Sequence, residues 1–398
     1  MQKIKISFVL LSAGMGGAEQ VVVNMLKNID RTKFDIYLIT NDEMLLYFTS
    51  LVKKEKILSI GKLFKFSKNT FINKVINKLI TKIDLRKILI KSKKNEIENF
   101  IKKNNIQILH SHLMYDLYAT NLINKQKFNI KTIYTVHAFL NLDQSINIYT
   151  VLSHDDYISL IKNNDYITTV SELLTDLTIE VIPDIRDKCT TILNALDRKD
   201  FLSFSHSQSS SNGHQKIELL FMGGEKLVKG GNILIDAFEI LIKKFKYTNL
   251  HLTILGPLNE SSKFYKLITE NKTIASYLSI VGFVEPPRHL AYIEKCDIMI
   301  LPSYTEGMPL AMFEGLRLGK CILASKIPTF KHYIEEGENG LLFDLDPKSL
   351  AMTIDKITQN HILLEKIKDN NRIYPIPYWD EIIKEYEDLY FKIIEGNQ

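Results

Sequence analysis

Two glutamates, Glu306 and Glu314, form an E-x7-E pair in the stretch YTEGMPLAMFEGL. The apolar segment before them, CDIMILPSY, predicts a buried strand that leads into a Gly/Pro loop, and Pro309 suits the first position of a following helix. The backbone N–H groups of residues 308–311, together with the helix dipole, would then form an anion site suited to a diphosphate.

Glu306 precedes this predicted anion site and Glu314 follows it. At the rise of a helix, the two glutamates would lie about 10 Å apart. That separation is a long reach for an acid/base pair. Each carboxylate can instead accept hydrogen bonds from vicinal hydroxyls, one pair on a sugar and the other on a ribose. The alternative is two solvated glutamates near a helix end.

A lysine with a possible phosphate role stands in a second strand–glycine loop–helix pattern, FMGGEKLVKGGNILIDAF at residues 221–238. Lys229 lies at the predicted helix start, from which its ammonium group can reach a phosphate, although a solvated lysine is the alternative. A third glycine loop, LSAGMGGAEQ, allows close approach of the backbone to a ligand at Gly14, Gly16 and Gly17. A dinucleotide-binding loop is disfavoured because Glu19 takes the place of the third glycine in GxGxxG.

Three histidines end predicted strands, His110 and His112 in ILHSHLMY and His137 in YTVHAF. A single strand-end histidine usually packs or bonds internally, but three at the carboxyl ends of one sheet indicate a site. No metal site is predicted. The DLD sequence at 344–346 is better explained by Asp346 as a helix N-cap followed by proline, and the three cysteines have no metal-like spacing.

The elements that position these residues alternate as strand and helix along all 398 residues, which predicts an α/β protein with parallel sheets. We expect two doubly wound Rossmann-like domains facing a central cleft. The first spans residues 1–202, a polar linker covers 203–215, the second spans 216–376, and an amphipathic helix at 377–396 packs on a domain face. The predicted strands are 4–11, 34–40, 106–110, 131–136, 166–170, 189–193, 217–222, 250–255, 278–281, 297–301, 320–324 and 340–343.

The first apolar run resembles a signal peptide but is short and leads into a glycine loop, so we interpret it as a buried strand. The sequence has no uninterrupted apolar stretch of about 18 residues, so no membrane span is predicted. The net charge of +5 is localised: residues 53–103 hold sixteen Lys/Arg against four Asp/Glu, which is +12, so the remainder carries −7. Aromatic residues interleave with these lysines. An anionic membrane surface is the preferred partner for this segment; a solvated helix pair is the alternative, and nucleic acid is disfavoured because no recognition module accompanies the segment.

Taken together, the motifs GMGGAEQ, VHAF, TTVSE, ILNALD, LVKGG, VGFVEP, EGMPLAMFEG and YWDEIIKEYEDLY resemble those of the family 4 retaining glycosyltransferases of the GT-B fold. This resemblance covers nearly the whole chain. It implies a transferase that moves a sugar from a nucleotide donor, most simply a UDP-sugar, to a glycan or lipid-linked acceptor. It also implies a cytoplasmic enzyme on the inner face of the membrane, with no cofactor, and a C-terminal helix that returns to the first domain. From the sequence itself we expect no metal requirement, because Lys229 and a helix N-terminus can neutralise a diphosphate.

The resemblance also implies roles for individual residues. Glu314 would hold the donor ribose, Glu306 the hydroxyls of the transferred sugar, Lys229 the leaving diphosphate, and His137 the sugar near its reacting carbon. Further donor-binding positions would be Gly16, Gly17, Gly223, Gly224, Phe283, Val284, Gly307, Met308, Pro309 and Leu310. Acceptor-side candidates would be His110, His112 and Ser171.

The chain departs from the family pattern at three positions, one of which is Ala195 in ILNALD, where glycine is common. Gly224 occupies the place of an arginine, which leaves Lys226 as a substitute cation, and His332 occupies the place of a frequent glutamate. Two alternative functions stay open. One is a nucleotide-sugar 2-epimerase of the same fold, which the E-x7-E loop and the C-terminal helix disfavour. The other is a catalytically idle nucleotide-sugar-binding homologue, which Gly224 and His332 support.

Overall fold

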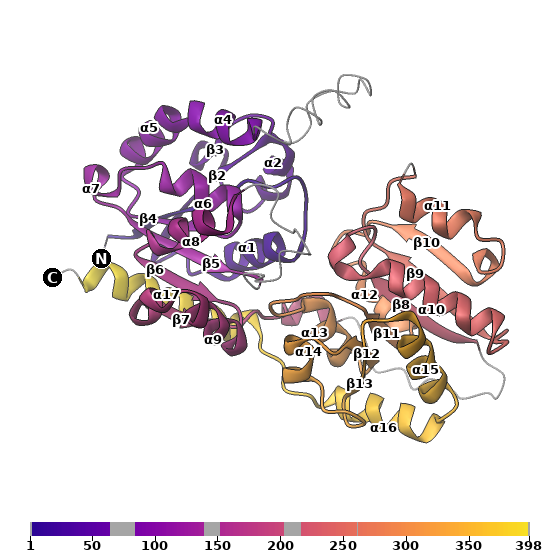
Figure 1. Ribbon diagram of the computed structural model, residues 1–398. Coiled ribbons are helices and arrows are strands. Elements are labelled where there is room, and N and C mark those ends of the chain that lie inside the picture. Colours follow the sequence, from indigo (N-terminus) through magenta and orange to yellow (C-terminus); the bar gives the residue numbers. More distant parts are fainter. Residues whose placement is uncertain (1, 64–83, 139–151, 203–215, 261, 397–398) are drawn as a thin grey trace. The chain divides into compact units, whose positions relative to one another are not determined.

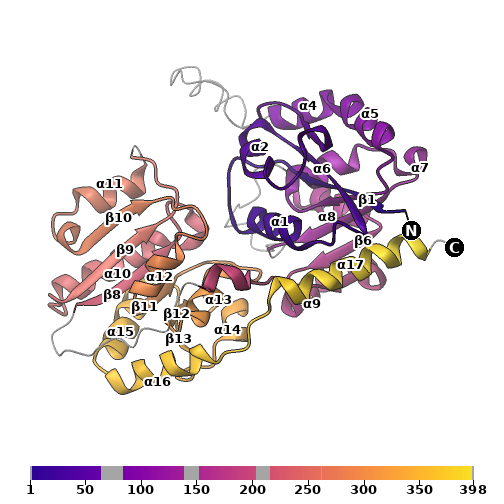
Figure 2. The same cartoon turned by 180° about the vertical axis from the view of Figure 1, so that it is seen from behind.

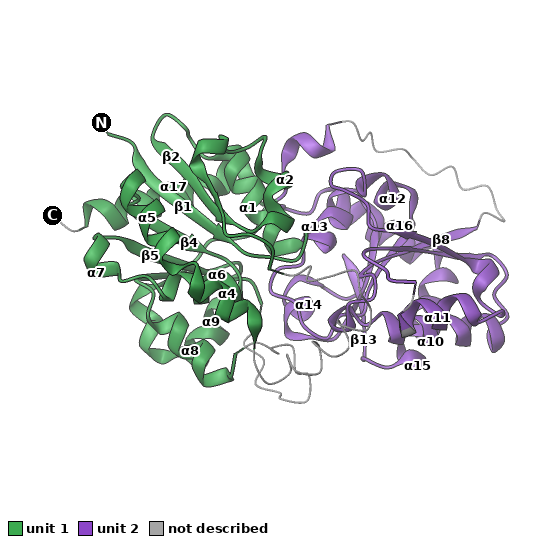
Figure 3. Ribbon diagram, turned by 90° about the horizontal axis from the view of Figure 1, so that it is seen from above, with its two compact units in different colours: residues 1–195, 377–398 green, residues 196–376 purple. Residues whose placement is uncertain are grey.

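The computed structural model of the protein, drawn in Figure 1, describes residues 2–63, 84–138, 152–202, 216–260 and 262–396. The chain divides into two compact units, which Figure 3 colours separately. Unit 1 comprises Met1–Ala195 and Pro377–Gln398, and unit 2 comprises Leu196–Ile376. Unit 1 ends its first segment at Ala195, whereas the sequence predicts a first domain that ends at Leu202. The predicted linker at 203–215 lies outside the described residues.

Unit 1 is built on a parallel sheet with the strand order β3-β2-β1-β4-β5-β6-β7. The first apolar run of the sequence is a buried strand, as predicted, and β1 pairs with β2 on one side and β4 on the other. Its side chains are almost all buried because helices cover both faces of a doubly wound sheet. The strands are β1 (Ile4–Leu10), β2 (Phe34–Thr40), β3 (Ile57–Ser59), β4 (Ile108–Ser111), β5 (Lys131–Val136), β6 (Tyr166–Thr169) and β7 (Cys189–Thr191).

The last helix of the chain, α17 (Trp379–Glu395), belongs to unit 1, where it packs beside α1 (Figure 2). Its apolar stripe is buried: Trp379, Tyr386 and Tyr390 are each no more than 1% exposed, and the Tyr390 ring packs edge-on against Phe34 of β2. The other described helices of unit 1 are α1 (Gly17–Asn28), α2 (Asp42–Phe48), α4 (Leu85–Ser92), α5 (Lys94–Asn104), α6 (Met114–Asn121), α7 (Lys125–Phe128), α8 (His154–Lys162), α9 (Glu172–Val181), and the 3-10 turns η1 (Lys54–Lys56) and η2 (Pro183–Lys188).

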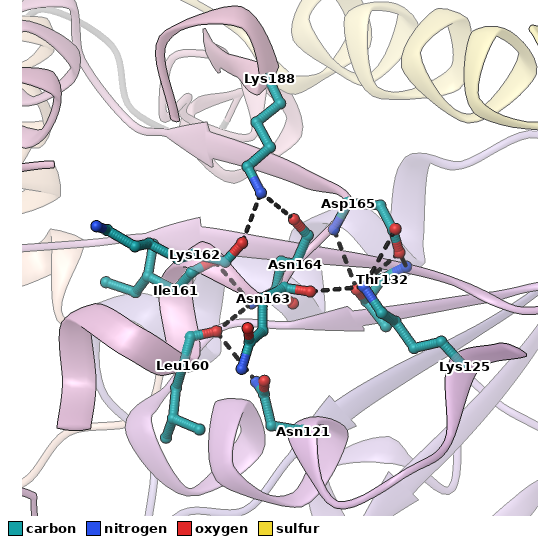
Figure 4. Close-up of polar contacts among 10 residues, drawn as sticks. All are labelled: Asn121, Lys125, Thr132, Leu160, Ile161, Lys162, Asn163, Asn164, Asp165 and Lys188. Atoms are coloured by element: carbon teal, nitrogen blue, oxygen red, sulfur yellow. Dashed lines mark hydrogen bonds and ion pairs between the residues drawn. The ribbon is translucent and has the colours of Figure 1, made fainter. Parts of the chain in front are cut away.

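Polar side chains join the segments at the amino-terminal ends of β5 and β6 (Figure 4). Asp165 accepts hydrogen bonds from the backbone N–H of Thr132 at 2.8 Å and from Lys125 Nζ at 3.1 Å. Lys188 Nζ donates to the carbonyl oxygens of Lys162 and Asn164 at 2.6 and 2.7 Å. These contacts satisfy loop backbone at the edge of the sheet opposite to the strand ends that carry the predicted site residues.

Unit 2 contains a second parallel sheet with the order β10-β9-β8-β11-β12-β13. Its strands are β8 (Ile217–Met222), β9 (Leu250–Leu255), β10 (Leu278–Gly282), β11 (Ile298–Leu301), β12 (Cys321–Ser325) and β13 (Gly340–Phe343). Its helices are α10 (Gly231–Lys243), α11 (Lys263–Glu270), α12 (Leu290–Lys295), α13 (Leu310–Arg317), α14 (Pro328–Tyr333), α15 (Pro347–Thr358) and α16 (His361–Arg372), with 3-10 turns η3 (Arg198–Phe201), η4 (Leu227–Lys229) and η5 (Ala275–Tyr277).

All twelve predicted strands are present with ends within two residues of the prediction, and the short edge strand β3 was missed. Asp346 is an N-cap, as predicted: its side chain accepts a hydrogen bond from the Ser349 N–H, and Pro347 follows as the first helical residue. Pro309 is displaced by one position. It is the N-cap of α13 and not its first residue, because its ψ of 101° is extended while its carbonyl already accepts the Met312 N–H.

No helix in the described part of the chain is long and apolar enough to cross a membrane.

Candidate functional site

Glu306 lies in the loop after β11 and forms an ion pair with Lys229, which lies in the loop after β8. Lys229 Nζ is 2.6 Å from Glu306 Oε1, and Ser303 Oγ donates to the same oxygen at 2.7 Å. The Glu306 side chain is 12% exposed and that of Lys229 is 30% exposed. The structure therefore brings together two residues that the sequence places in separate motifs, 77 positions apart.

Backbone contacts hold the two loops of this pair against each other. The Tyr304 N–H donates to the Val228 carbonyl at 2.9 Å, and Thr329 Oγ1 donates to the Glu306 carbonyl. Gly230 has a φ of +68°, and a Cβ built on it would lie 1.9 Å from the carbonyl oxygen of Pro302. A side chain at this position would therefore both strain the turn and separate the loops.

Glu314 lies on α13 beyond the loop, and its partner is different. Its Oε1 is 3.0 Å from Nε2 of His289, the residue that precedes α12. Both side chains are largely buried, with 11% of His289 and 16% of Glu314 exposed. Burial lowers the pKa of His289, but the carboxylates of Glu314 and Asp200 outweigh it, so the pKa is raised above its ordinary value. Sequence analysis missed His289 because its partner is on another helix.

The position where the family pattern has arginine cannot easily take a side chain. Gly224 has a φ of +55°, and a Cβ built there would be 2.3 Å from the Pro257 carbonyl oxygen. At Gly223 a Cβ would meet the Phe221 ring at 2.2 Å. Lys226, the suggested substitute cation, is exposed in the same loop.

Other predicted donor-site residues of unit 2 differ in their exposure. Phe283, which follows β10, is 45% exposed, which is unusual for a phenylalanine and leaves its ring accessible. Met308 is buried at 6% exposure and helps to anchor the loop before α13. Half-buried positions are Val284 and Leu310, and buried positions are Gly307 and Pro309.

The glycine loop of unit 1 precedes α1, with Gly16 as the N-cap residue. Neither Gly14 nor Gly17 has a positive φ, and a Cβ at either would have no heavy atom within 4 Å. Internal packing and backbone conformation therefore do not explain these glycines. Close approach of a ligand, as the sequence suggests, stays a prediction that fits this open space.

The three strand-end histidines of unit 1 form one chain of contacts. His110 is fully buried, with Nδ1 2.8 Å from the Tyr390 hydroxyl and Nε2 2.7 Å from Thr135 Oγ1. His112 is 1% exposed, and its Nδ1 is 3.0 Å from Nε2 of His137. Burial lowers the pKa values of all three, to about 3 for His110 and His137, so the cluster is neutral at pH 7.

Of these histidines, His137 alone is partly exposed, which makes it the member that can meet a substrate. The internal hydrogen-bonding alternative describes His110, whose ring nitrogens are both occupied within the core. Ser171 is also fully buried and serves as the N-cap of α9, accepting a hydrogen bond from the Leu174 N–H at 3.2 Å.

A buried carboxyl group that sequence analysis missed supports this strand edge. Asp116 accepts hydrogen bonds from the backbone N–H groups of Leu11, His112 and Leu113 at 2.6, 3.2 and 2.8 Å. Burial raises the pKa of Asp116 to about 8, although the three N–H donors oppose the shift. The group joins the ends of β1 and β4 and has no exposed surface for a ligand.

No group of three or more His, Cys, Asp or Glu side chains suited to a metal ion occurs among the described residues.

Two protein-family models match this chain, one for each half. The model described as Glycosyltransferase Family 4 matches residues 15–200, and the model described as Glycosyl transferases group 1 matches residues 204–374. Together they cover the histidines, the E-x7-E pair, the glycine loop that leads to Lys229, and the first glycine loop from Met15 onward.

Curated relatives and solved structures agree with these matches. An alpha-monoglucosyldiacylglycerol synthase of Acholeplasma laidlawii is 24% identical over 320 residues, which cover 75% of this chain and 78% of the relative. The capsular polysaccharide biosynthesis glycosyltransferase CapH of Staphylococcus aureus is 23% identical over 265 residues, covering 65% of this chain and 70% of the relative. The structure of Anabaena HepE with UDP and glucose matches with a TM-score of 0.71 at 14% identity, covering 98% of this chain and 100% of the other.

Proposed function

Since the chain belongs to the family 4 glycosyltransferases of the GT-B fold, we propose that it transfers a sugar from a nucleotide-diphosphate sugar, with UDP as the simplest nucleotide, to a glycan or lipid-linked acceptor with retention of anomeric configuration. The observation that carries the proposal is the Lys229–Glu306 pair beside the start of α13. A cation and a carboxylate held side by side suit the reaction of a nucleotide sugar. The cation would contact the leaving diphosphate, and the carboxylate would accept hydrogen bonds from the sugar hydroxyls.

The donor would be held by unit 2. Glu314 would accept hydrogen bonds from the ribose hydroxyls, and the exposed Phe283 ring would stack on the base. The backbone at the start of α13 would face the diphosphate. Lys229 then divides its hydrogen bonds between Glu306 and the β-phosphate. HepE, of the same fold, has been solved with UDP and glucose, which supports a UDP-sugar as the first donor to test.

In the proposed reaction the acceptor hydroxyl attacks the anomeric carbon from the face that the diphosphate leaves. The bond from that carbon to the diphosphate oxygen breaks, the bond to the acceptor oxygen forms, and a phosphate oxygen takes the hydroxyl proton. No protein nucleophile takes part. Lys229 stabilises the charge that develops on the diphosphate, and Glu306 and His137 orient the sugar.

We propose that no metal ion is needed. The support is the donor chemistry of the chain: the carboxylate of Asp346 in the DLD sequence is used to cap α15, and Lys229 with a helix start can neutralise the diphosphate.

The acceptor belongs to the proposal through the relatives. One relative is named for a glycolipid product and another for capsular polysaccharide, which supports a lipid-linked or glycan acceptor in cell-surface assembly. His137, proposed above to orient the transferred sugar, is partly exposed, which fits a substrate contact.

An anionic membrane surface, at the inner face of the cytoplasmic membrane, is the proposed docking partner of residues 53–103. Residues 64–83 of this segment lie outside the described residues. In the described part, α4 exposes Ile88 at 52% and Leu85 at 37% on a lysine-bearing helix, a combination that suits a lipid interface. Each neutralised lysine is expected to cost about 1 kcal/mol of binding to anionic vesicles. Sedimentation with such vesicles should be lost when glutamine replaces Lys74, Lys78, Lys82 and Lys87, and unchanged sedimentation would refute the membrane proposal.

The central experiment incubates the purified protein with UDP-, GDP- and ADP-sugars, with and without a membrane extract, before and after exhaustive EDTA treatment. We expect acceptor-dependent release of the nucleotide diphosphate, an EDTA-resistant rate, and a product whose anomeric configuration by NMR equals that of the donor. A sugar product released from donor alone would indicate a 2-epimerase, and donor binding without turnover would indicate an idle homologue. An inverted linkage would overturn the retaining mechanism.

A further inference from the structure

A buried histidine touches the carboxylate to which the proposed function gives the ribose. His289 Nε2 lies 3.0 Å from Glu314 Oε1, within hydrogen-bond distance. We propose that His289 is a positioning residue that holds the Glu314 carboxylate in the orientation that receives the ribose hydroxyls of a nucleotide-sugar donor. The inference rests on the proposed function, because the ribose contact of Glu314 is part of it.

Both partners start from fixed backbone. His289 ends the loop before α12, and its carbonyl accepts the N–H groups of Tyr292 and Ile293 at 3.0 and 3.3 Å. Glu314 lies within α13, between the buried Phe313 and Gly315. The freedom that remains is side-chain rotation of the glutamate, and the contact with the imidazole removes it before a ligand arrives.

Hydrogen bonding at the other ring nitrogen indicates which tautomer is present. His289 Nδ1 is buried and has no hydrogen-bond partner among the residues that the structure describes. A proton on Nε2 allows donation to Glu314 and leaves only a lone pair at Nδ1, whereas a proton on Nδ1 would bury an N–H without a partner. The neutral imidazole with its proton on Nε2 therefore already fits the site.

The charges around the imidazole strengthen this contact. Glu314 on α13 and Asp200 on η3 both favour the protonated ring, and together they raise the pKa of His289 against the effect of burial. In either protonation state, Nε2 carries a proton that faces Glu314.

This arrangement divides the work of the carboxylate. Oε1 is committed to His289, and Oε2 stays available for the hydroxyls of the ribose. Without His289, a donor would have to order the glutamate side chain on binding, which we expect to weaken the affinity about two- to tenfold. The expected loss concerns the contact of Glu314 with the nucleotide-sugar donor, so the contacts proposed for Glu306 and Lys229 should not change.

The test is a double-mutant cycle on donor affinity, measured by calorimetry with UDP-glucose, or with the best binder of the sugar-nucleotide panel. His289→Leu removes the N–H group that donates to Glu314, and His289→Gln places an amide N–H near the position of Nε2. We expect the loss in His289→Leu, recovery of most of it in His289→Gln, and no further loss when His289→Leu is added to Glu314→Ala. His361→Leu, a change of an exposed histidine at the start of α16, is the matched control and should bind as wild type.

Melting curves establish that each variant is folded, and His289→Asn replaces His289→Leu if the leucine variant is not. Wild-type affinity in a folded His289→Leu or His289→Asn variant would overturn the inference, and so would an equal loss in the Glu314→Ala background. If wild type binds no sugar nucleotide of the panel, the proposed function fails and this inference fails with it. Binding by wild type that is insensitive to His289 overturns the inference alone.

Discussion

Replacing each partner of the Lys229–Glu306 pair should change the affinity for UDP in opposite directions. The ammonium group of Lys229 is 2.6 Å from Glu306 Oε1, so a diphosphate must compete with this carboxylate for the same cation. UDP lacks the transferred sugar and therefore does not use the sugar contact proposed for Glu306. Lys229→Met should weaken UDP binding, and Glu306→Gln should strengthen it.

The expected magnitudes follow from the burial of the pair. Loss of a hydrogen bond from Lys229 to a charged phosphate costs about 1.5–3 kcal/mol, or roughly 10- to 150-fold in affinity. The competing ion pair is partly exposed, with 30% of the Lys229 side chain accessible, so its removal contributes at most about 1 kcal/mol. UDP should therefore bind up to about fivefold more tightly to Glu306→Gln.

Titration calorimetry with UDP measures both effects, and α10 offers a matched control. Lys243 and Glu239 form an ion pair on an exposed face of that helix, so Lys243→Met and Glu239→Gln should bind UDP as wild type does. A Glu306→Gln variant that loses affinity for UDP as strongly as Lys229→Met would show that the carboxylate supports the diphosphate site. Unchanged affinity in Lys229→Met would remove the lysine from the mechanism.

Gly230→Ala should lower the melting temperature of unit 2, since its Cβ would lie 1.9 Å from a backbone oxygen at a φ of +68°, whereas Gly14→Ala meets no atom within 4 Å and should be tolerated. Acidification from pH 7 to pH 5 should destabilise unit 1, because His110 and His112 have lowered pKa values in the folded protein. Below the ordinary pKa of histidine, the unfolded chain therefore binds more protons than the folded one, which favours unfolding. Each histidine should cost about 1.4 kcal/mol per pH unit there, whereas Asp116, whose pKa is raised, offsets about one of them; a pH-independent denaturation midpoint would contradict the assignment. Asp165→Ala should lower stability by about 1–3 kcal/mol in urea unfolding, because it removes acceptors from a partly buried network, and a smaller loss would mean that water replaces them.

Strand positions were predictable because buried parallel strands are short apolar runs between helical patterns. The missed strand, β3, is three residues long at the edge of the sheet and lies inside the lysine-rich segment, where composition gives no strand signal. The start of α13 was misplaced by one residue because proline fixes φ but not ψ, and ψ decides whether Pro309 belongs to the helix.

The predicted site residues stay a prediction, and the structure adds contacts between them that the sequence does not show. Lys229 and Glu306 each have a local motif, yet their pairing depends on two loops meeting at neighbouring strand ends, β8 and β11. His289 has no local signal at all, because a histidine before a short helix is ordinary and its partner lies 25 positions further along the chain on α13. Long-range polar contacts of this kind are set by packing, which a single sequence does not display.

Gly224, at the position where the family pattern has arginine, lies in a turn that leaves no room for a side chain, and this bears on the mechanism. With a φ of +55° and the Pro257 carbonyl 2.3 Å from a built Cβ, the loop has adopted a turn that excludes a side chain. Gly256, at a φ of +119°, packs its own backbone against Gly224, so the two glycines depend on each other. A second cation therefore cannot be regained by one substitution at 224. The glycine-rich turn instead fixes the loop that ends at Lys229, and the proposed diphosphate site must rely on this lysine, on α13 and, if a second cation acts, on the exposed Lys226.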